Sequence, residues 1–153
     1  MFLKEIFVAF ALVMLTVAIH ALGFAVVLRR MLRSQAVSVK NFLPIARMLV
    51  GLAWSLILIH VLEIALWAVF YWRSGCLPNA ETAFYFSGVT YTTVGYGDVV
   101  LTGPWRMLAP VEALTGILMC GLSTGLFFAR IHRLLYSWAN GQGLLSDAPT
   151  KDS

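Results

Sequence analysis

The nine residues TTVGYGDVV, from Thr92 to Val100, combine hydroxyl groups, two glycines at alternate positions and a carboxylate in an otherwise apolar chain. Glycine tolerates positive φ angles, so Gly95 and Gly97 allow successive carbonyl groups to face one side of the backbone instead of alternating as in a strand. Several copies around an axis would form stacked rings of oxygens that can replace the water shell of a cation. A phosphate-binding loop fits less well, because no lysine follows the glycines and no strand precedes them.

The chain that must position this stretch has the composition of an integral membrane protein. Of its 153 residues, 60% are hydrophobic and 12% are charged. The apolar runs 6–28, 45–70 and 107–129 are long enough to cross a hydrocarbon core about 30 Å thick, whereas the run 80–91 is too short. A cleavable signal peptide is an alternative for the first run, but the apolar residues continue past any cleavage site and end in arginines, as in a permanent anchor.

Local signals place the ends of the expected helices. Pro44 suits the first turn of the second long helix, and Asn79 suits the N-cap of the short helix that begins at residue 80. That helix should end near Tyr91, before the β-branched threonines and the glycines. The pair Gly103 and Pro104 opens the last long helix, and the residues after Tyr136 are expected to form a short, frayed tail.

The distribution of basic residues predicts the orientation in the membrane. One predicted side carries Arg29, Arg30, Arg33, Lys40, Arg47, Arg130 and Arg133, and the other carries Lys4, Arg73 and Arg106. The positive-inside rule therefore predicts an N-terminus outside, a cytoplasmic C-terminus and a glycine stretch at the outer face of a plasma or bacterial inner membrane. Because the charges are sorted by membrane side and form no patch with stacking aromatic residues, nucleic acid is not an expected partner.

Aromatic residues gather near the predicted borders of the membrane. Those near the outer border are Trp67, Tyr71, Trp72 and Trp105, and those near the inner border are Tyr136 and Trp138. They are expected to form interfacial belts, with packing between helices as the alternative.

The heptapeptide TTVGYGD, set between a short helix and a spanning helix, resembles the signature of potassium channels. The resemblance covers about residues 44–133, the pore module of that superfamily, and the extra first helix is similar to that of small three-helix bacterial members. It implies an all-α membrane protein with three transmembrane helices, a re-entrant pore helix and a selectivity-filter loop, which assembles as a homotetramer in contact with membrane lipid. The implied regions are 1–43 (first helix and basic connection), 44–133 (pore module) and 134–153 (cytoplasmic tail).

The resemblance also implies roles for the residues of the filter. The carbonyls that would bind K⁺ are those of Thr93, Val94, Gly95 and Tyr96. The Thr93 hydroxyl would add the innermost ring, Gly97 would turn the strip outward, and Asp98 would concentrate cations at the outer mouth. The side chains of Val94 and Tyr96 would point away from the axis and pack against the short helix. K⁺ is the permeant ion, and neither a cofactor nor enzyme chemistry is implied.

The chain departs from the family pattern beside the filter. It has Tyr85 and Phe86 where many relatives carry two tryptophans, and Val89 where some carry a glutamate. Tyr96 therefore loses an indole donor, and Asp98 loses a carboxyl partner. These departures leave the carbonyl rings unaffected, and they make a weakly selective cation channel one alternative to a selective channel. A second alternative, from a different class, is a non-conducting accessory subunit of another channel or transporter.

The last helix contains candidates for a gate. Gly116 has the family's spacing for a hinge glycine, with close helix packing as the alternative. The residues that share a stripe and would line a cavity are Ile117, Cys120, Thr124 and Phe128, and Phe128 is the candidate constriction. The gating stimulus stays open between pH, membrane tension, lipid and a regulatory partner on the basic connection. Usual voltage sensing is not expected, since the first helix has no arginine ladder.

Ionisable side chains inside the predicted spans form a further group. His60 and Glu63 are one turn apart on the second helix, and Glu112 could reach toward the short helix; His20 lies in the first span without an assigned role. Intramembrane ionisable groups are costly and usually paired or functional. The two hypotheses are a pH-sensitive contact that biases gating and a buried polar clamp. For the cysteines, Cys76 is expected as a free thiol or in an intersubunit disulfide.

Overall fold

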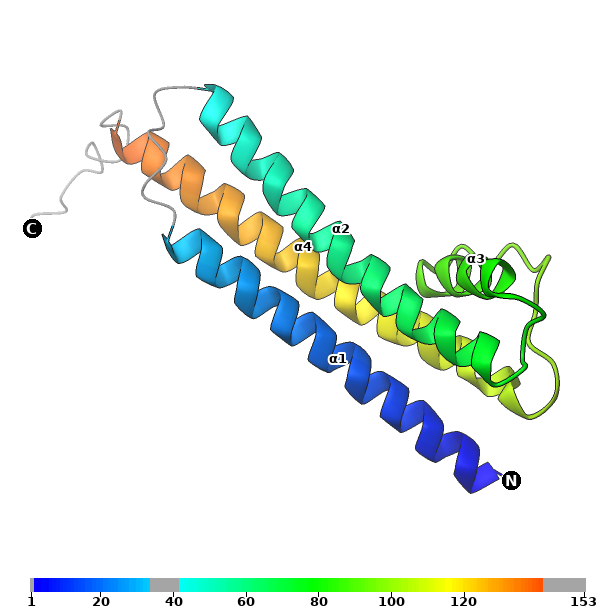
Figure 1. The fold of residues 1–153 in the computed structure, drawn as a ribbon. Helices are drawn as coiled ribbons and strands as arrows, with labels where there is room; N and C mark the ends of the chain where they lie inside the picture. Colours follow the sequence, from blue (N-terminus) through cyan, green and yellow to red (C-terminus); the bar gives the residue numbers. More distant parts are fainter. Residues whose placement is uncertain (1, 34–41, 142–153) are drawn as a thin grey trace, which may run out of the picture.

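Three long helices and one short helix make up the fold. The computed structural model describes residues 2–33 and 42–141; residues 34–41 of the predicted basic connection, Lys40 among them, and residues 142–153 of the predicted tail lie outside these ranges. The helices are α1 (Phe2–Arg33), α2 (Phe42–Arg73), α3 (Ala80–Tyr91) and α4 (Leu108–Gly141), and a 3₁₀ turn η1 (Gly103–Met107) precedes α4. The long helices run side by side, and α3 lies next to α2 at the end of the bundle where α1 begins (Figure 1).

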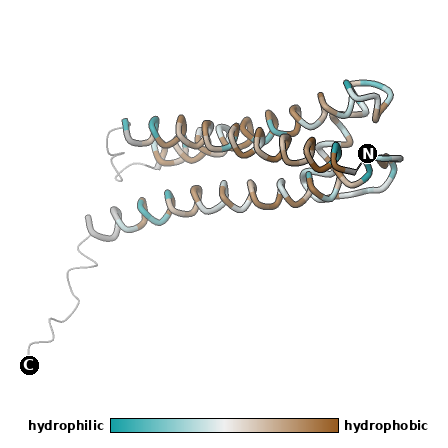
Figure 2. The backbone as a smooth tube through the Cα atoms, turned by 90° about the horizontal axis from the view of Figure 1, so that it is seen from below, coloured by the Kyte–Doolittle hydropathy of each residue, from teal (hydrophilic) through white to brown (hydrophobic). Residues whose placement is uncertain are grey.

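The long helices are membrane spans by length and composition. Segments Leu3–Met31, Leu43–Arg73 and Gly103–Tyr136 contain the three predicted apolar runs. Hydrophobic residues fill their central parts, while hydrophilic residues gather toward the ends (Figure 2). The 32 residues of α1 extend about 48 Å at 1.5 Å per residue, more than a hydrocarbon core requires. The protein is therefore a multi-pass membrane protein.

The ends of α3 match the predicted ones, whereas the end of α4 does not. The Asn79 side chain accepts a hydrogen bond from the Thr82 backbone N–H at 2.8 Å, and α3 ends at Tyr91. In contrast, α4 continues past 133, where the tail was predicted to begin, as far as Gly141. The sequence from 130 to 140 holds neither glycine nor proline, so nothing stops the helix before Gly141.

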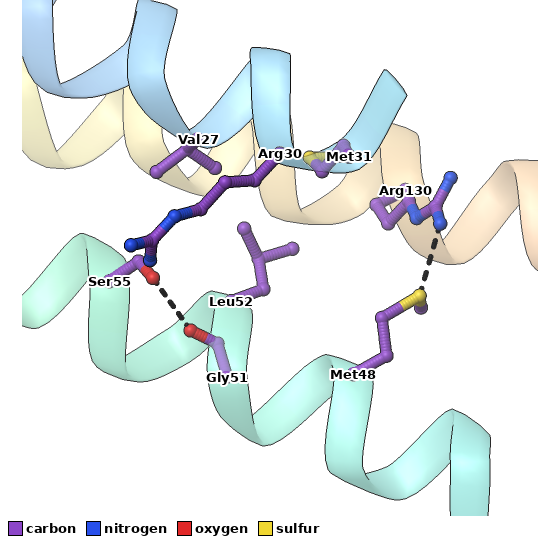
Figure 3. A pocket seen from close by; sticks show the side chains of 8 residues that line it. All are labelled: Val27, Arg30, Met31, Met48, Gly51, Leu52, Ser55 and Arg130. Atoms are coloured by element: carbon purple, nitrogen blue, oxygen red, sulfur yellow. Dashed lines mark hydrogen bonds between the residues drawn. The ribbon is translucent and has the colours of Figure 1, made fainter. Parts of the chain in front are cut away.

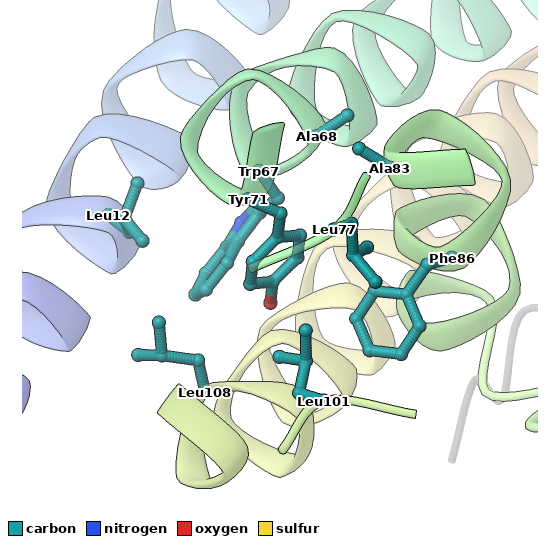
Figure 4. Close-up of a cluster of buried hydrophobic side chains, with 9 residues drawn as sticks. All are labelled: Leu12, Trp67, Ala68, Tyr71, Leu77, Ala83, Phe86, Leu101 and Leu108. Atoms are coloured by element: carbon teal, nitrogen blue, oxygen red, sulfur yellow. The ribbon is translucent and has the colours of Figure 1, made fainter. Parts of the chain in front are cut away.

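A buried cluster joins α3 to the long helices near the end where α1 begins (Figure 4). Its members are Leu12, Trp67, Ala68, Tyr71, Leu77, Ala83, Phe86, Leu101 and Leu108. Trp67 and Tyr71 are fully buried, and Phe86 meets the Tyr71 ring edge-on at 5.3 Å. Trp67 and Tyr71 therefore pack between helices, which was the alternative to an interfacial position. Trp72 is exposed, as an interfacial residue would be.

The first helix packs tightly against the second. A buried group of Val27, Leu52, Leu56 and Ile59 fills the contact toward the other end of the bundle. A Cβ atom on Gly23 would lie 2.6 Å from Ile59 Cδ1, so α1 approaches α2 at a distance that only glycine permits without a shift of the Ile59 side chain. Halfway along α1, Trp67 Nε1 donates to Thr16 Oγ1 at 3.0 Å.

Candidate functional site

The backbone of the glycine stretch alternates in handedness. Gly95 and Gly97 have φ values of +56° and +80°, the positive values that the sequence predicts for them. Thr93 also has a positive φ, +61°, which the sequence analysis missed. A β-branched residue rarely adopts this conformation, and it costs on the order of 1–3 kcal/mol. Val94 and Tyr96, between these positions, keep negative φ, so positive and negative values alternate from 93 to 97.

The N–H groups at the start of this stretch donate hydrogen bonds to carbonyls of α3. Thr93 N–H donates to Thr90 O at 2.9 Å, and Val94 and Gly95 both donate to Val89 O, at 3.0 and 3.2 Å. Within the described ranges, the carbonyls of residues 93–96 receive no hydrogen bond. The C-terminal end of α3, with its negative partial charge, lies against the same turn. The geometry therefore leaves a run of carbonyl oxygens available to a cation or to a hydrogen-bond donor.

The side chains of the stretch are uncovered in the single chain. Val94 and Tyr96 are 52% and 73% exposed. These exposed fractions show that the short helix of the same chain does not bury either side chain, so their predicted packing stays a prediction. The stripe of α4 proposed to line a cavity is exposed as well, at Ile117, Cys120, Thr124 and Phe128.

Asp98 is held by the short helix through a contact that the sequence analysis missed. Tyr85 Oη donates to Asp98 Oδ2 at 2.6 Å. This hydrogen bond lowers the pKa of the Asp98 carboxyl from its ordinary value and raises the pKa of the Tyr85 hydroxyl. Tyr85 thus supplies a hydrogen-bond partner for Asp98 in place of the carboxyl group that some relatives carry where this chain has Val89. The sequence indicates Tyr85 and Asp98 separately. Their contact could not be predicted, because no spacing rule pairs a helix residue with a loop residue 13 positions later.

Glu63 is the centre of a buried polar network that joins all four helices. It is fully buried, accepts a hydrogen bond from the Tyr91 hydroxyl, and lies 2.8 Å from His20 Nδ1 and 3.2 Å from His60 Nδ1. His60 Nε2 lies 3.0 Å from Ser123 Oγ on α4. The predicted shared face of His60 and Glu63 is present, and the partner of His20, left unassigned from sequence, is Glu63. The network acts as a clamp, while a pH-sensitive role for His60 stays a prediction.

Three residues of this network have side chains of types that can bind a metal ion. The ligand atoms of His20, His60 and Glu63 lie within 4.8 Å of one another, and imidazole and carboxylate groups are zinc ligands. In this arrangement, however, both imidazoles turn Nδ1 toward the carboxylate, which satisfies the buried charge by hydrogen bonds. The set forms a polar clamp around the carboxylate, in which His20 Nε2 is buried without a hydrogen-bond partner.

Glu112 forms a second clamp beside the short helix. It is fully buried on α4, accepts a hydrogen bond from Tyr71 Oη at 2.7 Å and another from Ser87 Oγ at 2.5 Å. The predicted reach of Glu112 toward the short helix is therefore present. It joins α2, α3 and α4 directly beside the buried cluster.

Gly116 lies where α4 crosses the end of α3. A Cβ atom at this position would lie 2.0 Å from the Tyr91 carbonyl oxygen and 2.9 Å from its carbon. This contact gives Gly116 a packing role, and its hinge role stays a prediction. Cys76 and Cys120 are both free thiols in the described chain.

These features define a class before any relative is considered: a helical membrane protein with an irregular, carbonyl-presenting loop between a short helix and a spanning helix. Residues 57–133, half of the chain, match the ion channel family. The chain belongs to this family, which is not a family of enzymes. The match begins within α2, includes α3 and the glycine stretch, and leaves α1 outside.

Curated relatives match a shorter segment. Over 43 residues the chain is 46% identical to Protein LctB of Bacillus caldotenax and, equally, to Protein LctB of Geobacillus stearothermophilus. The aligned segment is 28% of this chain and spans about a third, 32%, of the length of each relative. No solved structure matches the chain.

Proposed function

We propose that this protein is a subunit of a potassium-selective channel in which four copies surround one ion pathway. The observation that carries the proposal is the backbone of residues 93–97. Its φ angles alternate in sign, and its first N–H groups are turned to α3, so the carbonyls are left for an ion. Membership of the ion channel family supports the same function.

In this proposal, K⁺ loses its water to stacked carbonyl rings. The carbonyls of Thr93, Val94, Gly95 and Tyr96 bind the ion, and the Thr93 hydroxyl forms the innermost ring. Gly97 turns the strip outward, and four Asp98 carboxylates raise the local cation concentration at the outer mouth. The C-terminal end of each α3 adds negative partial charge below the filter.

Fourfold assembly accounts for the uncovered surfaces of the single chain. Val94 and Tyr96 would pack against neighbouring copies, and the stripe from Ile117 to Phe128 would face the axis. Phe128 narrows the pathway toward the basic end of the bundle, and Gly116 is the proposed bend that widens it. By the positive-inside rule, this basic end is cytoplasmic.

Ion flux from liposomes tests the proposal. Purified protein is reconstituted into liposomes loaded with K⁺ or, in a matched set, with Na⁺. We expect rapid K⁺ flux, little Na⁺ flux, and loss of K⁺ flux in Gly95→Ala, because alanine is strained at a φ of +56°. The matched control is Gly121→Ala, whose added Cβ meets no atom within 4 Å.

Two outcomes would contradict the proposal in different ways. Equal flux of both ions would identify a weakly selective cation channel. A failure of the purified chain to form tetramers, with no flux, would indicate an accessory subunit that needs another protein.

A further inference from the structure

A cavity of about 240 Å³ lies between α1, α2 and α4 at the end of the bundle opposite to α3 (Figure 3). Its walls are apolar where Val27 and Met31 of α1 face Leu52 of α2. Two arginines complete the lining, Arg30 from α1 and Arg130 from α4. Figure 3 shows Arg30 extending toward Ser55 and Arg130 toward Met48, with Leu52 between them.

The arginine on α4 has donors that the protein does not satisfy. Arg130 Nη2 donates to the Met48 sulfur at 3.0 Å, a weak acceptor, and Arg130 Nε is buried without any hydrogen-bond partner. The Ser55 hydroxyl donates to Gly51 O of its own helix at 2.8 Å, and within the described residues it accepts no hydrogen bond from either arginine. A guanidinium cannot lose its proton, so a buried N–H without a partner is costly unless a ligand accepts from it.

No carboxylate in the described ranges compensates these charges. The ion pairs found there join Glu63 to His20 and His60 only, in a separate cluster nearer to α3. The cavity lies near one end of all three spans: Met31 ends the first span, Met48 lies five residues after the start of the second, and Arg130 lies six residues before the end of the third. Near the end of a membrane span, the phosphates of a lipid leaflet meet its acyl chains.

We propose that this cavity binds an anionic phospholipid. The phosphate would accept hydrogen bonds from Arg30 and Arg130, with Arg130 Nε and Nη2 offering the paired geometry that suits phosphate oxygens. The beginning of one acyl chain would lie against Val27 and Leu52. One lipid would then join α1, which lies outside the family match, to α4, the helix proposed to line the pore.

Lipid retention by the purified full-length protein tests this site independently of conduction. The protein in a neutral detergent is titrated with phosphatidylglycerol or phosphatidylcholine, and bound lipid is counted by native mass spectrometry. We expect saturable binding of phosphatidylglycerol, at least tenfold tighter than that of phosphatidylcholine. Arg130→Gln and Arg30→Gln should each weaken it about tenfold or more, since charge-assisted hydrogen bonds are lost.

Two further variants separate the cavity from general surface charge. Arg133→Gln removes an exposed positive charge three residues from Arg130 and should change the affinity less than twofold. Gly51→Leu keeps every charge but adds a side chain beside the cavity, at a position whose Cβ meets no atom within 4 Å. It should weaken binding while leaving the thermal midpoint of the protein unchanged.

Three results would overturn the proposal. Equal losses in Arg130→Gln and Arg133→Gln would indicate attraction to surface charge alone. Equal binding of the two lipids would exclude a phosphate-specific site for an anionic lipid. Displacement of phosphatidylglycerol by inorganic phosphate at equal concentration would show that the acyl chain contributes nothing, and the ligand would be a free anion.

Discussion

At the scale of single residues, the Tyr85 hydroxyl holds Asp98 beside the glycine stretch. The hydrogen bond favours the ionised carboxylate and lowers the pKa of Asp98. A carboxyl whose pKa is lowered by folding adds stability above its unfolded pKa, and this stability is lost as the pH falls through the folded pKa. The outer mouth should therefore stay charged and ordered to a lower pH than an isolated aspartate would allow.

The Tyr85→Phe variant tests this effect. Without the donor, the pKa of Asp98 should return toward its ordinary value, so half-loss of K⁺ flux on external acidification should occur at a higher pH than in the wild type. The measurement is K⁺ flux against external pH between about 3 and 6. Tyr136→Phe, an exposed tyrosine on α4, is the control and should keep the wild-type midpoint. Identical midpoints in Tyr85→Phe and wild type would show that the hydrogen bond does not control the titration.

At Gly116, the lack of a side chain allows α4 to pack closely against the end of α3. In Gly116→Ala the new Cβ would lie 2.0 Å from a backbone oxygen, which cannot rotate away. We expect α3 and α4 to be pushed apart at a cost of about 1–3 kcal/mol, with a lower thermal midpoint. The control is Gly125→Ala, where the space is open, and it should melt like the wild type. Equal midpoints for the two variants would leave only the hinge role for Gly116.

The sequence allowed some residues of the site to be predicted and not others. The glycines and the Asn79 cap follow from local conformational preference, which a short stretch of sequence carries. The positive φ of Thr93 does not, because three hydrogen bonds from the stretch to α3 impose it against the preference of threonine. The partner of Asp98 depends on how the loop folds back, and no local pattern encodes that.

At the scale of elements, the Glu63 network fixes four helices to one another. A carboxylate accepts from all three of its neighbours, whereas a glutamine has only one acceptor oxygen. Glu63→Gln should therefore leave a buried donor unsatisfied and lower the free energy of unfolding by about 1–3 kcal/mol. Glu81→Gln, exposed on α3, is the matched control. Thermal unfolding followed by circular dichroism measures both, and equal midpoints would contradict the clamp.

Hydrophobic length and capping residues predicted the helices well, because both are local properties. The sequence left alternatives open where the outcome depended on contacts between helices. Trp67 and Tyr71 were expected near the outer membrane border, with packing between helices as the alternative, and they are buried because α1 and α4 cover that face of α2. Similarly, His20 could be paired with Glu63 only once the register of α1 on α2 was known.

At the scale of the whole molecule, the arrangement makes the orientation testable. The start of α1 and the glycine stretch share one end of the bundle, and the basic residues 29–33 and 130–133 share the other. In a background with Cys76→Ser and Cys120→Ser, we expect Ser74→Cys to react with an impermeant maleimide in intact cells. Arg133→Cys should react only after the membrane is opened. The native Cys76 is removed because it lies on the same side as Ser74 and would add its own signal, even though burial raises the pKa of its thiol and slows its reaction. The reverse labelling pattern would invert the proposed topology.

The position of His20 has a consequence for any shortened form of the chain. The family match begins within α2, so deletion of α1 would retain the whole matched segment, residues 57–133. Yet such a truncation would strip Glu63 of its contact with His20 and expose the face of Trp67 that bonds to Thr16. The first helix is therefore part of the packed structure that supports the proposed pore. The shortest chain that folds and conducts should be longer than the segment that matches the family.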